Sequence, residues 1–342
     1  MFRGFRPVYQ VFTPLLMSIL AGPGCNVDLY EKSADMNYFE ESFAERHFRE
    51  GGPYVHLNTS HKENDMFFTD ERELATIINY LSIAVFASSC RLLAFAIMSN
   101  HFHFILEGMQ NKVELFWNRL KDNLTNYYKR HGKADMMNDV EARTTSINNL
   151  IQLRNEIAYV LRNPFVDRLD IHVFFDIYTS SYLYFNPMLL KKGIPASELR
   201  GRALRQFTRS RVITEVDPRI YVKDGVAQTW SFVDYKYTEK FYDNAQQFVY
   251  SVLKNVEAQI ETASRHGETL YLSDDELWPV TFRISRERFH STPKEMSNMD
   301  RKKLGVILKK EYNASNKQIA RMTKLDLKEV DSLFPLSKGH RS

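Results

Sequence analysis

Residues 90–106 constrain the fold more tightly than any other stretch of this 342-residue chain. Cys90 to Met98 is, apart from Arg91, a continuous apolar run with the length and composition of a buried strand. Ser99-Asn100 then forms a tight turn, and residues 101–106 return beside the first strand as its hairpin partner. The chain must therefore build a sheet around this hairpin.

The segments on either side of the hairpin predict an α+β fold. A short strand is expected at residues 54–59, and a helix opens near Thr69 or Asp70 with apolar residues at helical spacing. Strand, helix and hairpin form the first half of a ferredoxin-like antiparallel sheet with packed helices. A helix at 113–130, a strand near 139–146 and a helix at 148–163 that Pro164 stops would complete it.

Two histidines and a tyrosine helix are the candidate chemical groups of this region. Side chains alternate along a strand, so His101 and His103 point the same way, about 7 Å apart, and can converge on a metal ion. Two half-buried histidines bonded to neighbours are the alternative. On the 148–163 helix, Asn155, Tyr159 and Asn163 recur every four residues and share one polar stripe.

Composition narrows the class of protein. A hydrophobic content of 44% excludes a disordered chain, and two cysteines indicate a reducing, cytoplasmic compartment. The apolar run at residues 11–21, preceded by Arg3 and Arg6, resembles an export signal, but Pro14 interrupts it and it is too short to span a membrane. We expect residues 1–50 to be an extension or to include a misassigned start, and we expect no membrane association.

Basic residues gather in two later segments that can contact phosphates. The first lies within residues 196–211, and the second within three short helices expected between Asp300 and Phe334, which predict a helix-turn-helix. Residues 300–342 hold 11 Lys or Arg against 5 Asp or Glu, a local excess larger than the +4 of the whole chain. The candidate DNA-contacting residues are Arg200, Arg202, Arg205, Arg209, Lys317, Arg321, Lys324 and Lys328. A solvated charged face and a helical interaction module are the alternatives.

Two motifs resemble a known family. Met98-Ser99-Asn100-His101-Phe102-His103-Phe104 is similar to the His-hydrophobic-His motif of the HUH single-tyrosine transposases, particularly their REP-associated branch. The segment Tyr159-Val160-Leu161-Arg162-Asn163-Pro164 resembles that family's second motif, and Ser180-Ser181-Tyr182 a segment that often follows. The order and separation of these motifs strengthen the resemblance, which spans roughly residues 53–335.

The resemblance implies an enzyme that cleaves and rejoins single-stranded or hairpin DNA. It assigns His101, His103 and Asn163 as metal ligands, and two imidazoles with an amide oxygen suit Mg²⁺ or Mn²⁺ better than structural zinc. It assigns Tyr159 as the nucleophile, which forms a 5′-phosphotyrosine intermediate and needs no nucleotide cofactor. It also implies a bacterial, nucleoid-associated protein, either monomeric or homodimeric.

The expected organisation has four parts. Residues 1–50 are the extension, 51–190 the catalytic domain, 191–290 a mostly helical accessory region and 291–342 the helix-turn-helix module. In the accessory region one long helix is expected at 238–262, with no catalytic group, and His56 and His61 are interpreted as structural or exposed. Two other functions remain open: a non-catalytic regulator that binds DNA through the C-terminal helices, and a metallohydrolase that uses His101, His103 and a carboxylate not yet identified.

Overall fold

The structure is a computed structural model that describes residues 41–60, 66–163, 178–210, 215–253, 256–266, 272 and 274–335. His61, Pro164 and Arg211 lie outside the described residues. The chain divides into two compact units, residues 1–42 and 43–342, and all the described helices and strands belong to the second.

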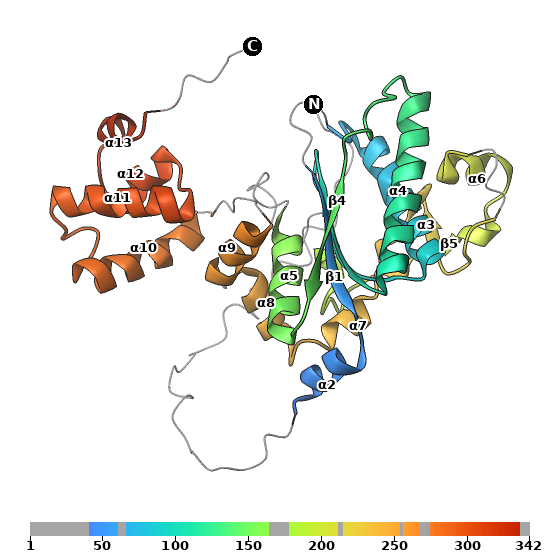
Figure 1. The fold of residues 1–342 in the computed structure, drawn as a ribbon, viewed down its shortest axis with the longest axis horizontal. Helices are drawn as coiled ribbons and strands as arrows, with labels where there is room; N and C mark the ends of the chain where they lie inside the picture. Colours follow the sequence, from blue (N-terminus) through green and yellow to red (C-terminus); the bar gives the residue numbers. More distant parts are fainter. Residues whose placement is uncertain are drawn as a thin grey trace. The chain divides into compact units, whose positions relative to one another are not determined.

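Elements are numbered along the chain (Figure 1). The α-helices are α2 (Phe43–Glu50), α3 (Glu71–Ser88), α4 (Gln110–Arg130), α5 (Leu150–Arg162), α6 (Gly201–Thr208), α7 (Tyr235–Glu239), α8 (Ala245–Leu253), α9 (Val256–Arg265), α10 (Asp274–Phe289), α11 (Asn298–Tyr312), α12 (Asn316–Thr323) and α13 (Leu327–Leu333). The strands are β1 (Tyr54–Thr59), β2 (Arg91–Ile97), β3 (Phe102–Glu107), β4 (Ala142–Ile147), β5 (Ile194–Pro195), β6 (Tyr221–Lys223) and β7 (Val226–Ala227). Short 3-10 turns occupy Ser181–Leu183, Ala196–Glu198 and Thr229–Ser231.

The expected α+β class is confirmed by a four-stranded antiparallel sheet in the order β2-β3-β1-β4. The elements β1, α3, β2, β3, α4 and β4 follow one another in the βαββαβ order of a ferredoxin-like layout. β5, β6 and β7 form a second, small antiparallel sheet. Within the described residues, we find no helix that combines the length and the apolar character needed to cross a membrane.

Strand β3 separates an apolar face of the sheet from a polar one. Phe102 and Phe104 point to the apolar face, where their rings lie 4.5 Å from Phe67 and 5.2 Å from Phe116 of α4. His103, between them in sequence, points to the opposite face, where α5 packs against β2 and β3. Figure 1 shows α3 and α4 on one side of the sheet and α5 on the other.

Side-chain caps fix the ends of the helices that flank this sheet. Asp70 caps α3 by accepting hydrogen bonds from the backbone N–H groups of Arg72 and Glu73, each at 2.8 Å. Asn149 caps α5 in the same way, with Gln152 N at 2.8 Å. The start of α5 is therefore set by its own sequence, and with it the position of each later turn of the helix.

The prediction of one long helix over residues 238–262 is wrong, because the chain forms α7, α8 and α9 there. Asn244 caps α8 through its Oδ1, which accepts from Gln247 N at 2.8 Å, and the Gln247 side chain accepts from Asp243 N at 2.8 Å. The Asn244 side chain captures a backbone N–H in this way, and so it starts a new helix inside an otherwise continuous helical pattern.

The three C-terminal helices lie close to their expected positions. Ser315 and Gln318 form a capping box at the start of α12, and Asp326 caps α13 by accepting from Lys328 N at 2.8 Å. Between these helices Lys324 adopts φ +62°, the left-handed conformation for which glycine is favoured. An additional helix, α10, packs against α11 and α12.

Candidate active site

His101 and His103 meet at the start of β3. Their ring centroids lie 4.8 Å apart with the planes 81° from parallel, and both side chains are buried. The His101 Nδ1 atom lies 2.7 Å from Asn100 Oδ1, a pure acceptor, so Nδ1 carries the hydrogen and the lone pair resides on Nε2. The two imidazoles therefore converge as the strand alternation predicts.

Helix α5 brings Tyr159 and Asn163 to the same place. Asn163 Nδ2 lies 2.9 Å from His103 Nε2, and the Tyr159 ring centroid lies 5.7 Å from that of His103. The two residues are one helical turn apart, which is why both can reach one strand residue. The structure thus assembles the four residues that the two sequence motifs singled out.

Beneath these residues lies a carboxylate that sequence reasoning missed. Glu156 is fully buried, and its Oε2 lies 2.7 Å from His56 Nδ1 and 2.8 Å from His266 Nε2. Its Oε1 accepts from the Arg265 guanidinium at 3.0 Å. Burial opposes ionisation, yet the hydrogen bonds from His266 and His56 prevail and lower the pKa of Glu156 to about 2.

His56 links this carboxylate to the histidine pair. Its Nε2 lies 3.0 Å from His103 Nδ1, and its side chain is fully buried on β1. The interpretation of His56 as a structural residue therefore holds for its burial, but it contacts the candidate site directly. Glu156 could have been noticed as the acidic residue three positions before Tyr159, whereas His266, 110 residues further along the chain, gave no local signal.

The residues present can accommodate a divalent cation in two ways. Imidazole nitrogens of His101 and His103 could supply two ligands, and the Asn163 amide oxygen could supply a third if the amide turned, because the amide nitrogen now faces His103. His56, Glu156 and His266 also place one ligand atom each within 4.8 Å of one another. In this second group the carboxylate already accepts a guanidinium hydrogen bond, so a cation there would face the positive charge of Arg265.

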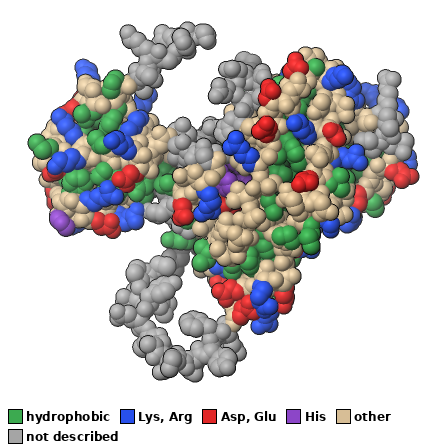
Figure 2. Space-filling view, viewed as in Figure 1, with side chains coloured by type: hydrophobic (Ala, Val, Ile, Leu, Met, Phe, Trp, Pro, Cys, Tyr) green, Lys and Arg blue, Asp and Glu red, His purple; other side chains and the backbone are tan. Residues whose placement is uncertain are grey.

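The basic residues expected to contact DNA belong to other segments of the chain, in and around α6 and the C-terminal helices. Arg202 and Arg205 of α6 are exposed, while the Arg200 guanidinium donates to Leu199 O at 2.9 Å. In the C-terminal helices Lys317 and Lys328 are exposed, but Arg321 pairs with Asp274 through two hydrogen bonds of 2.6 and 2.9 Å. The ammonium group of Lys324 lies 5.3 Å from the centre of the Trp278 ring. Figure 2 shows basic side chains on these helices interspersed with acidic ones.

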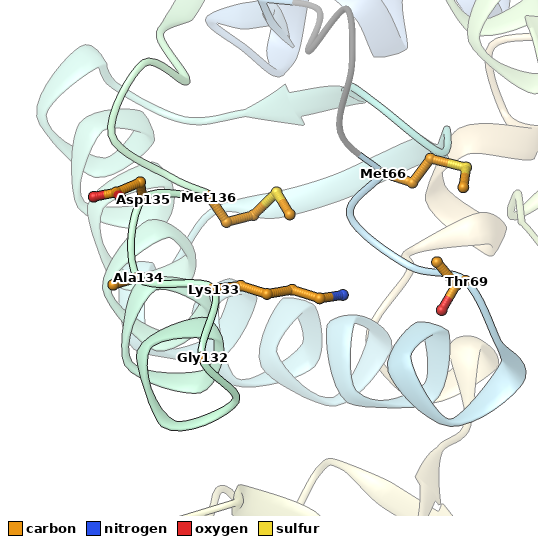
Figure 3. Close-up of a pocket in the computed structure, with 7 residues that line it drawn as sticks. All are labelled: Met66, Thr69, Gly132, Lys133, Ala134, Asp135 and Met136. Atoms are coloured by element: carbon orange, nitrogen blue, oxygen red, sulfur yellow. The ribbon is translucent and has the colours of Figure 1, made fainter. Parts of the chain in front are cut away.

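A cavity near the start of α3 contains none of the candidate catalytic residues (Figure 3). It has a volume of about 350 Å³, and Lys133 extends its side chain across it toward Thr69. The ammonium group of Lys133 is 3.2 Å from the Glu73 carboxylate, so its charge is already compensated. The candidate catalytic residues thus lie outside this cavity.

Comparisons with known proteins give little guidance. No protein-family model matches the chain, and no curated protein matches it significantly. Among solved structures, that of a REP-associated tyrosine transposase bound to a REP hairpin is similar at 13% identity and a TM-score of 0.32, covering 44% of this chain and 84% of that one. A likeness this distant carries no weight, so we argue function from this chain's own residues.

Proposed function

We propose that this protein is a metal-assisted enzyme that cleaves and rejoins single-stranded or hairpin DNA through Tyr159, in the manner of a tyrosine transposase. The observation that supports the proposal is the convergence of His101 and His103, at the start of β3, with Tyr159 and Asn163, at the C-terminal end of α5. Two motifs separated by more than fifty residues meet there, as one reaction centre requires.

Each side chain has a defined task in this reaction. His101 Nε2, His103 Nε2 and Asn163 Oδ1 would hold Mg²⁺ or Mn²⁺, which acts as a Lewis acid on the scissile phosphate. Asn163 now presents Nδ2 to His103, so a half-turn of its amide would present Oδ1 instead. The Tyr159 ring is enclosed by imidazoles, with the His266 centroid at 5.9 Å, which restricts the directions from which its oxygen can attack.

The covalent step is a transesterification. The Tyr159 hydroxyl loses its proton to solvent, and its oxygen bonds to the phosphorus as the bond to the 3′ oxygen breaks. The 3′ oxygen takes up a proton and leaves as a free hydroxyl, while the other fragment stays attached as a 5′-phosphotyrosine. Rejoining reverses these steps, because the phosphotyrosine ester conserves the phosphodiester bond.

The test is a denaturing gel after incubation with a panel of single-stranded hairpin DNAs and Mn²⁺. The wild-type protein should form a covalent adduct that retards its migration, and Tyr159→Phe should form none while still binding DNA. Tyr250→Phe is the matched control, because Tyr250 is 60% exposed on α8 and is the more accessible phenol. Adducts that persist in Y159F would contradict the proposal.

A second candidate function is supported by a different observation. Helices α11, α12 and α13 each begin at a side-chain cap, and α11 and α12 carry more basic than acidic residues, as a DNA-binding helix-turn-helix would. DNA binding through them would need none of the histidines. A protein that binds duplex DNA tightly, yet forms no adduct with any hairpin in the panel, would favour this regulatory function.

A further inference from the structure

A continuous row of hydrogen-bonding groups runs through the interior from α9 to the candidate metal ligands. His266 and Arg265 contact Glu156, Glu156 contacts His56, His56 contacts His103, and His103 contacts Asn163. The four consecutive distances from His266 to Asn163 are 2.8, 2.7, 3.0 and 2.9 Å. The histidines and Glu156 are buried, so water does not compete for their hydrogen bonds.

The position of each hydrogen in this row can be assigned by starting from the Glu156 carboxylate. A carboxylate paired with the Arg265 guanidinium only accepts, so His56 Nδ1 carries a hydrogen and donates it to Glu156. In a neutral imidazole the other nitrogen must then accept, so His56 Nε2 receives a hydrogen bond from Nδ1–H of His103. The lone pair of His103 therefore resides on Nε2.

Asn163, at the opposite end of the row, independently indicates that the lone pair of His103 is on Nε2. Asn163 presents its amide nitrogen, a pure donor, to His103 Nε2. A hydrogen on His103 Nε2 would place two donors against each other at 2.9 Å. The contacts of Glu156 and of Asn163 thus indicate the same tautomer of His103, in which the lone pair of Nε2 is directed at the position where the ion would bind.

The competing interpretation places a metal ion on His56, Glu156 and His266 themselves. An ion on His56 Nδ1 would move the hydrogen of that ring to Nε2, and His103 Nδ1 would then have to accept it. The His103 hydrogen would shift to Nε2 and remove that ligand, so the two sites exclude each other. Because Arg265 already donates a hydrogen bond to Glu156, its positive charge disfavours a cation bound to that carboxylate.

We propose that Glu156 and His56 are positioning residues, which hold His103 in the Nδ1–H tautomer and so keep its Nε2 ready to bind the metal ion. The inference rests on the proposed function only in taking His101, His103 and Asn163 as the metal ligands. Carboxylate–histidine–metal arrangements of this type tune affinity through the outer partner, whose loss costs about 10- to 100-fold in metal binding. Here a second imidazole extends the arrangement by one residue.

The first test needs neither DNA nor metal. Nitrogen NMR of protein labelled with ¹⁵N-histidine distinguishes a protonated from an unprotonated ring nitrogen, and the metal-free protein should show His103 with hydrogen on Nδ1. In Glu156→Gln the amide can donate to His56, and His103 should shift toward the Nε2–H form. A wild-type protein with the hydrogen on Nε2 would overturn the inference.

The second test is calorimetric titration with Mn²⁺. Glu156→Gln should weaken binding by about 10- to 100-fold. Glu261→Gln should leave it unchanged, because the Glu261 carboxylate also pairs with Arg265, at 3.2 Å, but is exposed and outside the row. Thermal melting of each variant identifies any that does not fold, and the wild-type tautomer remains decisive in that case.

Other outcomes separate this inference from the proposed function. Mn²⁺ binding lost in His266→Gln but kept in His101→Gln would place the ion on the His56, Glu156 and His266 group and overturn the inference. If the tautomer and the Mn²⁺ results are as expected but no DNA adduct forms, the enzymatic proposal fails while the role of Glu156 and His56 stands.

Discussion

Asn163 differs from the other candidate ligands because its side chain offers either a donor or an acceptor. In the structure the donor faces His103, an arrangement that suits the metal-free protein. Asn163→Ala should therefore lower Mn²⁺ affinity by at least about tenfold, since even outer partners of ligands contribute that much. Asn163→Asp should retain or increase it, because a carboxylate is a better ligand for a hard cation.

Titration calorimetry measures both Asn163 variants, and Asn155→Ala is their control. Asn155 lies two turns earlier on the same helix and is part of the same polar stripe, but it is not among the residues gathered around His103. Equal losses in the Asn155 and Asn163 variants would indicate a general effect on α5 rather than a ligand.

Glu156 should make stability depend on pH in the acidic range. Its pKa is lowered in the folded protein from 4.5 to about 2, so its stabilising contribution is complete above about pH 4.5 and is lost as the pH falls toward 2. The free energy of unfolding of the wild type should therefore fall over this window more steeply than that of Glu156→Gln. Urea denaturation at several pH values measures the difference.

The exposed carboxylate of Glu261 again supplies the comparison. Glu261→Gln should follow the wild-type curve throughout, because that side chain is 75% exposed. Parallel curves for the wild type and E156Q would show that the buried carboxylate does not stabilise the fold in its charged form.

At the scale of elements, α5 is the helix on which the site depends. It packs on β2 and β3 of the sheet and also on α8 and α9. Ile157 of this helix is fully buried, whereas Ile151 on the same helix is 71% exposed. The two isoleucines differ in burial but not in type.

This pair predicts a clear contrast in stability. Ile157→Ala should lower the free energy of unfolding by about 2–5 kcal/mol, because it removes buried methyl groups and leaves a cavity. Ile151→Ala should change it by no more than about 0.5 kcal/mol. Chemical denaturation measures both, and comparable losses would mean that α5 is not seated on the sheet as described.

Helices and strands could be predicted from the sequence where turn or helix-stop residues coincide with the ends of an apolar pattern. The hairpin of β2 and β3 and the helix that ends at Arg162 follow from apolar periodicity, from the turn at Ser99-Asn100 and from the helix stop expected at Pro164. The division of residues 238–262 was not predicted, because the Asn244 cap lies inside an apolar pattern of helical period. The roles of Glu156 and His266 were missed for another reason: only tertiary packing of α9 on α5 brings them together.

At the scale of the whole molecule, positive charge is concentrated in the C-terminal residues. The net excess of six in residues 300–342 exceeds the net charge of the entire chain, so the remainder is slightly acidic. Such a distribution favours electrostatic attachment of nucleic acid at one end of the sequence. Not every basic residue there is available, because Asp274 already neutralises Arg321.

Lys317 and Lys328 should contribute to DNA binding in the full-length protein. Lys317→Gln and Lys328→Gln should each weaken duplex binding and reduce the slope of log affinity against log salt by about 0.9, as expected for one lost phosphate contact. Fluorescence anisotropy across a salt series measures the slope.

Lys236→Gln on α7 is the control, because that exposed lysine pairs with Glu239 at 2.8 Å and lies outside the C-terminal helices. If the three variants lose the same amount of DNA affinity, binding does not depend on where the lysine lies, and the C-terminal helices are not the DNA-binding surface.

The contact of Arg265 and His266 with Glu156 has a consequence for how such a chain can be inherited. Domain shuffling exchanges segments that fold without help from residues beyond their own ends. A segment that ended after α5 would leave a buried acid without its guanidinium and one of its two imidazoles. The smallest segment of the chain that keeps this buried acid fully paired therefore extends at least to residue 266.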